Sequence, residues 1–128
     1  MGVVIRKSYC DLSFGQLHFR SAGSPDLPLL LLLHQSPSSS VMFENLMAEL
    51  HDSFYMLAPD TPGFGMSDPM PGVVSTENYA AAINEFLELR QTGTALVFGH
   101  HTGAAIAVQL AYDFPDKVKA LALSGPTL

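Results

Sequence analysis

Apolar residues in this chain come in short continuous runs, and polar turns rich in glycine and proline separate them. Every position from Leu29 to Leu33 is leucine, which is typical of a strand buried on both faces of a sheet. Similar runs follow in FYMLAP (54–59), TGTALVFG (92–99) and VKALALSGP, where the strand itself is expected from Val118 to Ser124. The pattern therefore predicts four buried strands.

Helical patterns fill the intervals between these runs. Ser39 or Ser40 can cap a first helix, and Ser75 or Thr76 can begin a second, because serine and threonine oxygens accept hydrogen bonds from free N–H groups of a first turn. A third helix is expected over Gly103–Phe114, where a proline follows directly and stops it. Strand and helix thus alternate along the chain.

The segment before the first buried strand has a different pattern. Ser8 to Ser13 and Gln16 to Ala22 alternate loosely around a turn at Gly15, which predicts an antiparallel hairpin. Alternating strands and helices require a mostly parallel sheet with helices on both faces. No repeat or change in composition marks a second unit. We therefore expect residues 1–128 to form one α/β domain.

Composition narrows the classes of function. The net charge of −6 leaves no basic surface for nucleic acid. Cys10 is the single cysteine, so no internal disulfide can form, which favours a cytoplasmic location. The leucine run is too short to cross a membrane, and the N-terminus does not look like a signal peptide. No dinucleotide-binding or phosphate-binding loop is present, so no cofactor is expected.

Three polar loops follow three successive buried strands. Their sequences are HQSPSSS (34–40), DTPGFGMSD (60–68) and GHHTG (99–103). Sites in open α/β sheets form at the carboxyl ends of the strands. We therefore expect these loops to meet at one edge of the sheet.

The loops and their surroundings carry a resemblance to a known family. LLLLLHQSP, APDTPGFGMSD, VFGHHTGAAIA and YDFPDKVKALALSGP occur in the order found in the α/β-hydrolase superfamily. The sequence resembles the branch that contains small esterases, epoxide hydrolases and haloalkane dehalogenases. The resemblance covers residues 8–128 and implies a partial α/β-hydrolase fold. It corresponds to the N-terminal half, without the lid, the later strands or the downstream acid and histidine of that family.

The resemblance implies a reactive position on a sharp turn. Gly99 and Gly103 would allow the turn, and His101 stands where the family has its nucleophile. The N–H of Thr102, at a helix N-terminus, would bind an oxyanion. The second donor would be the N–H of Gln35 or Ser36, although the family prefers glycine at position 35.

The resemblance gives the loop after the second buried strand a structural role. Asp60 is expected to hydrogen-bond nearby amides, and two glycines would permit tight backbone turns. The residues assigned to this structural loop are Asp60, Gly63, Gly65 and Ser67.

The five histidines are expected to differ in role. His34 and His100 are candidate substrate contacts, although in the resembling family the residue at position 34 more often braces its loop. His18 and His51 are expected at the surface. No carboxylate or cysteine lies near His34 or His101 in sequence, so no metal site is expected.

His101 leaves three interpretations open. It could act as nucleophile or general base, since a helix N-terminus disfavours imidazolium. It could line a site that binds a ligand without chemistry, or fill space in an inactive site. The resemblance favours a hydrolase of a small ester or related carbon electrophile. The alternatives are an inactive binding or scaffold domain, or one half of a split or cleaved enzyme.

The predicted strand from Val118 to Ser124 lacks the neighbour that the family places beside it. An exposed apolar edge strand can pair with other chains. We therefore expect a homo-oligomer, or a second polypeptide that completes the sheet, in addition to a small-molecule substrate.

Overall fold

One mixed sheet organises the computed structural model, which describes residues 2–126. Residues 1, 127 and 128, which belong to the expected single domain, lie outside this part. The six strands stand in the order β1-β2-β4-β3-β5-β6. Their bounds are β1 Arg6–Leu12, β2 Gly15–Ala22, β3 Leu29–Leu33, β4 Tyr55–Pro59, β5 Ala95–His100 and β6 Val118–Ser124.

Strand directions confirm the predicted α/β class. β1 pairs with β2, and β2 with β4, in antiparallel fashion. β4, β3, β5 and β6 run parallel to one another. The sheet is therefore mostly parallel, with the N-terminal hairpin as its antiparallel edge.

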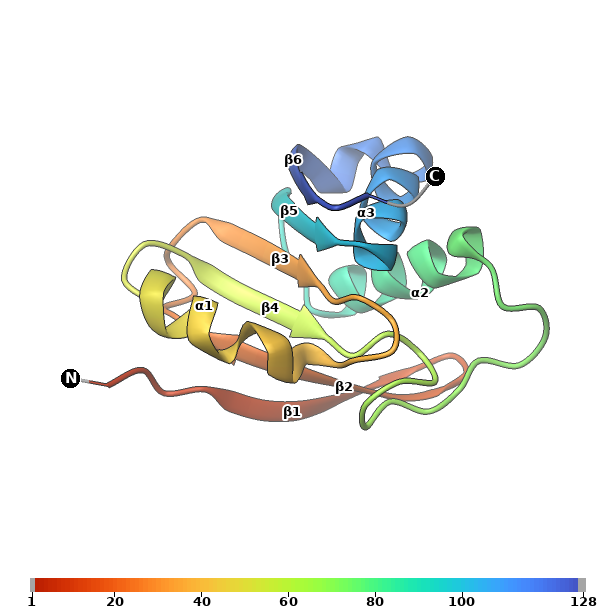
Figure 1. The fold of residues 1–128 in the computed structure, drawn as a ribbon, viewed down its shortest axis with the longest axis horizontal. Helices are drawn as coiled ribbons and strands as arrows, with labels where there is room; N and C mark the ends of the chain where they lie inside the picture. The colour runs from red at the N-terminus through yellow and green to blue at the C-terminus, as the bar shows by residue number, and fades with distance from the viewer. Residues whose placement is uncertain (1, 127–128) are drawn as a thin grey trace.

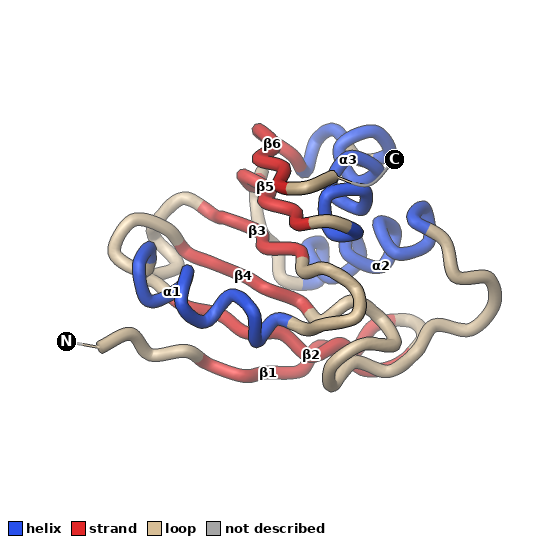
Figure 2. The backbone as a smooth tube through the Cα atoms, in the orientation of Figure 1, coloured by secondary structure: helices blue, strands red, loops and turns tan. Residues whose placement is uncertain are grey.

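Helices cover both faces of this sheet. α1 (Glu44–Leu50), preceded by the 3-10 turn η1 (Ser40–Phe43), lies on one face (Figures 1 and 2). α2 (Thr76–Leu89) and α3 (Thr102–Asp113) lie on the other, and the short turn η2 (Pro115–Lys117) leads into β6.

The leucine run of β3 is explained by this layering. Leu31 and Leu33 belong to the core under α2 and α3, and Leu32 belongs to the core under α1. Leu30 packs against the α1 side as well. Because successive side chains of a strand point to opposite faces, a strand covered on both sides is apolar at every position.

The third buried strand differs from its expected bounds. It begins at Ala95 instead of Thr92 and includes His100. The N–H and hydroxyl of Thr92 both donate to the carbonyl of Leu87, so this residue closes the end of α2. At the other end His100 pairs with Ser124 of β6, which extends the ladder up to the turn.

The parallel strands bring the three expected loops to one edge. β3 ends before His34, β4 before Asp60 and β5 before His101. Among residues 2–126, no helix combines the length and apolar character needed to cross a membrane.

Candidate active site

The chain turns sharply between β5 and α3, at His101. This residue has φ 53° and ψ −115°, and its N–H donates to the carbonyl of Ser124 at 2.9 Å. Positive φ is unfavourable for a residue with a Cβ, and such backbone strain gathers at functional sites. The turn leaves His101 exposed at the edge where the loops meet.

Two glycines make this turn possible. A Cβ on Gly99 would lie 2.6 Å from the carbonyl carbon of Gly103 and 2.7 Å from Cα of Ala104. A Cβ on Gly103 would overlap the carbonyl oxygen of Leu33 and lie 2.8 Å from that of His34. The start of α3 therefore touches the backbone of β5 and β3 directly, which only glycine permits.

The imidazole of His101 has a defined place. A Cβ built on Gly125 would meet three atoms of this ring at 3.2–3.5 Å, so the ring lies against that glycine. The ring centroid of His100 is 4.2 Å away, with the two planes at 77°. Within residues 2–126, the ring nitrogens of His101 form no hydrogen bond. His101 can therefore offer a nitrogen to a bound molecule or water.

His100, expected as a substrate contact, is half-buried beside His101. Its Nδ1 lies 3.1 Å from the hydroxyl of Ser124. This places His100 against the neighbouring ring and strand β6, where it supports His101.

The backbone amides around the turn are not equivalent. The N–H of Ser36, expected as an oxyanion donor, donates to Oγ1 of Thr102 at 2.7 Å. For the N–H groups of Gln35 and Thr102, no partner is found in the described part of the chain. The expected donor Ser36 is therefore occupied in this structure, whereas Gln35 and Thr102 keep free donors.

His34 is placed differently from the expectation that it contacts substrate. It is fully buried, with 0% exposure. Its Nδ1 donates to the carbonyl of Gln35 at 2.7 Å, and its Nε2 accepts from the N–H of Thr61 at 2.9 Å. Both ring nitrogens are thus used inside the protein, which corrects that expectation: His34 braces the loop after β3.

Burial lowers the pKa of His34 below its ordinary value of 6.5, although the Gln35 carbonyl and Asp60 oppose this shift. The neutral ring is needed because protonated Nε2 could not accept from Thr61. Between pH 6.5 and the lowered pKa, His34 therefore binds a proton in the unfolded chain more than in the folded one, and we expect the free energy of unfolding to fall as pH decreases through this range.

Urea unfolding between pH 5 and 8 checks this expectation. The free energy of unfolding should fall less with decreasing pH in His34→Gln than in the wild type. His51→Gln is the control, because it changes a half-buried histidine away from the site, and its free energy of unfolding should fall as much as in the wild type. Equal pH slopes in the wild type and His34→Gln would contradict the assignment.

Asp60 organises the second loop as expected. Its carboxylate is fully buried and accepts from the N–H of Ser40 at 2.7 Å, the N–H of Met66 at 2.9 Å and Nδ1 of His18 at 2.8 Å. Burial alone would raise the pKa of Asp60, but these hydrogen bonds to the charged form lower it overall.

His18 takes part in this loop, contrary to expectation. Expected at the surface, it is 3% exposed. Its N–H donates to the hydroxyl of Ser67 at 2.9 Å, and that hydroxyl donates to the carbonyl of Asp60 at 2.8 Å. The signal for its burial was its place between two apolar residues, Leu17 and Phe19. All three are buried, because β2 lies between β1 and β4 inside the sheet.

The glycines of this loop serve its tight course. Gly63 and Gly65 have φ of 86° and 53°. A Cβ on Gly65 would overlap the Asp60 carboxylate, with Cγ at 2.5 Å. Among residues 2–126, no three histidine, cysteine or acidic side chains gather in a way that could hold a metal ion.

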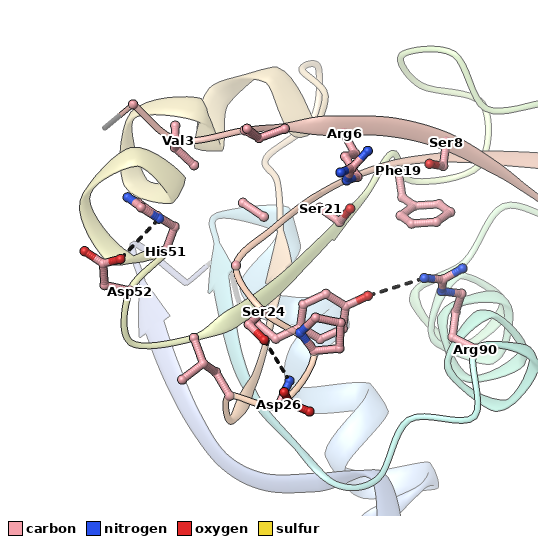
Figure 3. A pocket seen from close by; sticks show the side chains of 17 residues that line it. Val3, Arg6, Ser8, Phe19, Ser21, Ser24, Asp26, His51, Asp52 and Arg90 are labelled. Atoms are coloured by element: carbon pink, nitrogen blue, oxygen red, sulfur yellow. Dashed lines mark hydrogen bonds and ion pairs between the residues drawn. The ribbon is translucent and has the colours of Figure 1, made fainter.

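A cavity of about 730 Å³ lies away from this site (Figure 3). It adjoins the first residue of β4, Tyr55, and the end of α2, where Arg90 donates to the Tyr55 hydroxyl at 3.3 Å. Since the three loops meet at the carboxyl ends of the parallel strands, this cavity is at the opposite end of the sheet and does not belong to the turn at His101.

Comparison with known proteins gives a consistent picture. The alpha/beta hydrolase fold family matches residues 28–128. The chain is 35% identical over 111 residues to 2-(acetamidomethylene)succinate hydrolase of Mesorhizobium japonicum, covering 87% of this chain and 39% of the relative. It is 30% identical over 114 residues to haloalkane dehalogenase 2 of Mycobacterium tuberculosis, covering 88% and 39%. The solved epoxide hydrolase CorEH superposes with a TM-score of 0.88 at 28% identity, covering 94% and 42%.

The chain is shorter than the proteins that it matches. The chain spans 30–39% of the curated relatives and 40–46% of the solved chains that it matches. The family match over residues 28–128 contains the four parallel strands, the turn at His101 and the loops around it. On its sequence match and its fold, the chain belongs to the α/β-hydrolase family.

Proposed function

We propose that this chain carries the turn and the amide donors of a hydrolase that acts on a small ester or a related carbon electrophile. The observation that carries the proposal is the exposed imidazole of His101 on a strained turn at the start of α3. Relatives named as hydrolase and dehalogenase support the reaction class.

His101 acts as a general base in this proposal. An imidazole is longer than a serine side chain, so its nitrogen stands further from the Thr102 N–H and leaves room for a water molecule. A ring nitrogen takes a proton from this water while the water oxygen bonds to the substrate's carbonyl carbon. The carbonyl oxygen becomes an oxyanion beside Thr102. The bond to the leaving alkoxide then breaks, and the alkoxide takes the proton from the imidazolium.

The same proposal includes a polypeptide segment that covers the exposed apolar surface of β6. Leu121 and Leu123 on β6, the outermost strand of the described sheet, are 39% and 40% exposed. A groove of about 370 Å³ lined by apolar residues runs between β6 and the α1 side, where Leu50 and Phe54 lie. We propose that the remaining sequence of a longer protein, a second chain or a second copy covers this surface. A cytoplasmic setting, supported by the single cysteine Cys10, belongs to the same proposal.

An alternative function is favoured by one observation. Within residues 2–126, no acidic side chain hydrogen-bonds His101, so the orienting partner of a catalytic histidine is missing from this part. A site that binds a ligand without turning it over fits that arrangement.

Hydrolysis of a panel of p-nitrophenyl esters separates the two functions. Removing a general base costs about 10²–10⁴-fold in rate, so we expect His101→Ala to lose kcat by this factor. The matched control His51→Ala should keep wild-type rates. Activity that appears only in His101→Ser would show that the natural protein lacks a working nucleophile and would support the binding function.

A further inference from the structure

We propose that the side-chain hydroxyl of Thr102, held by the N–H of Ser36, is a direct oxyanion donor of this site. This inference rests on the proposed function and assigns one of its contacts. It assigns to the Thr102 hydroxyl the contact that the family resemblance assigns to the Ser36 amide.

The hydrogen bond between these residues has a direction. The N–H of Ser36 donates to Oγ1 of Thr102 at 2.7 Å. A hydroxyl that accepts one hydrogen bond still has its own O–H to donate. Among residues 2–126, no acceptor takes this O–H. Thr102 is half-exposed, and its hydroxyl has an unused donor at the same helix start as its N–H.

The Gln35–Ser36 peptide is held from both of its ends. Its carbonyl accepts from Nδ1 of His34 at 2.7 Å, and its N–H donates to Thr102. Because His34 is fully buried and also accepts from Thr61, this peptide is not free to rotate. The Ser36 N–H thus stays directed at the threonine hydroxyl, and reaches a substrate oxygen only through it.

The resulting chain of donors runs from Ser36 N–H to Thr102 O–H to the oxyanion. Hydrogen bonds in such a chain polarise one another, so the accepted bond strengthens the hydroxyl as a donor. Thr102 then presents its N–H and its O–H to one oxygen. The rival arrangement is that the hydroxyl merely blocks the Ser36 amide.

The two arrangements predict opposite effects when the hydroxyl is removed. The rate falls if the hydroxyl is a donor, and it rises if removal frees the Ser36 N–H.

Ester hydrolysis by Thr102→Val distinguishes them. Loss of one oxyanion donor costs about 10²–10³-fold in kcat, and we expect a loss of this size with little change in KM. Thr102→Ser should recover most of it, because it restores the hydroxyl. The control Thr92→Val removes a hydroxyl that donates to Leu87 at the far end of α2 and should not reduce kcat. Rates in Thr102→Val equal to or above the wild type would overturn the inference.

Acetate binding tests the same contact without turnover. We expect acetate to shift the amide NMR signal of Thr102, and to bind at least about tenfold more weakly to Thr102→Val than to the wild type or Thr102→Ser. Amide exchange at Ser36 should be faster in Thr102→Val. If esters are not hydrolysed but this pattern appears, the proposed hydrolase function fails, and the Thr102 hydroxyl remains a donor to a bound anion. No acetate binding by the wild type, or equal binding by Thr102→Val, would overturn it.

Discussion

Gly103→Ala is expected to lower the free energy of unfolding by about 3–5 kcal/mol, which is a large part of the stability of a domain of this size. The new Cβ would overlap the carbonyl oxygen of Leu33 and lie 2.8 Å from that of His34. Both are backbone atoms at the end of β3, so they cannot turn aside as a flexible side chain could. The strand or the start of α3 must move instead.

Helix propensity predicts the opposite sign for this substitution. Gly103 lies in the first turn of α3, and alanine is favoured over glycine inside a helix by about 1 kcal/mol. A loss of stability would therefore come from the close approach alone. Urea unfolding measures it.

Gly93→Ala is the matched control. Apart from its chain neighbours, no atom of the described residues lies within 4 Å of a Cβ built at Gly93, in the loop before β5. We expect its free energy of unfolding to stay within about 0.5 kcal/mol of the wild type. If Gly103→Ala were as stable as Gly93→Ala, the turn between β5 and α3 would not have the geometry described.

Asp60→Asn is the substitution with the second-largest expected effect. It keeps the shape of the side chain but removes the charge, and it places an NH₂ group toward the donors that now point at the carboxylate, from Ser40, Met66 and His18. Leaving a buried donor without its acceptor costs about 1–3 kcal/mol, and more where the acceptor is charged, as the Asp60 carboxylate is. We expect a loss of about 3 kcal/mol by urea unfolding at pH 7.

The pH profile gives this prediction a second readout. The pKa of Asp60 is held below its ordinary value of 3.8, so its contribution is present above that pH and is lost as pH falls through the lowered value. The stability difference between the wild type and Asp60→Asn should therefore shrink in strong acid.

Asp68→Asn serves as the control for Asp60→Asn. Asp68 belongs to the same loop, but it is exposed, and within residues 2–126 its carboxylate accepts one hydrogen bond, from the N–H of Gln16 at 2.8 Å. We expect a loss of about 1 kcal/mol or less. Similar losses in both variants would contradict the central role of Asp60.

Much of the fold could be predicted because its signals are local. The leucines of β3 reveal burial on both faces, and β6 was expected at the bounds it has, Val118–Ser124. A sharp turn at His101 was expected from the resemblance to the family, in which Gly99 and Gly103 would allow it. Side-chain period and glycine spacing report on the few residues around them, so they can be recognised without the rest of the molecule.

The tertiary structure alone decided which polar groups of the site are free. Ser36 and Thr102 are 66 positions apart, and His18 and Asp60 are 42 apart. No periodic pattern links such residues, because a hydrogen bond depends on the position of two groups to within a fraction of an ångström. The sequence by itself therefore determined the layers and the buried strands, and its resemblance to the family indicated the place of His101. Packing of the three loops determined that His34 is enclosed and that the Ser36 amide is directed at the threonine hydroxyl.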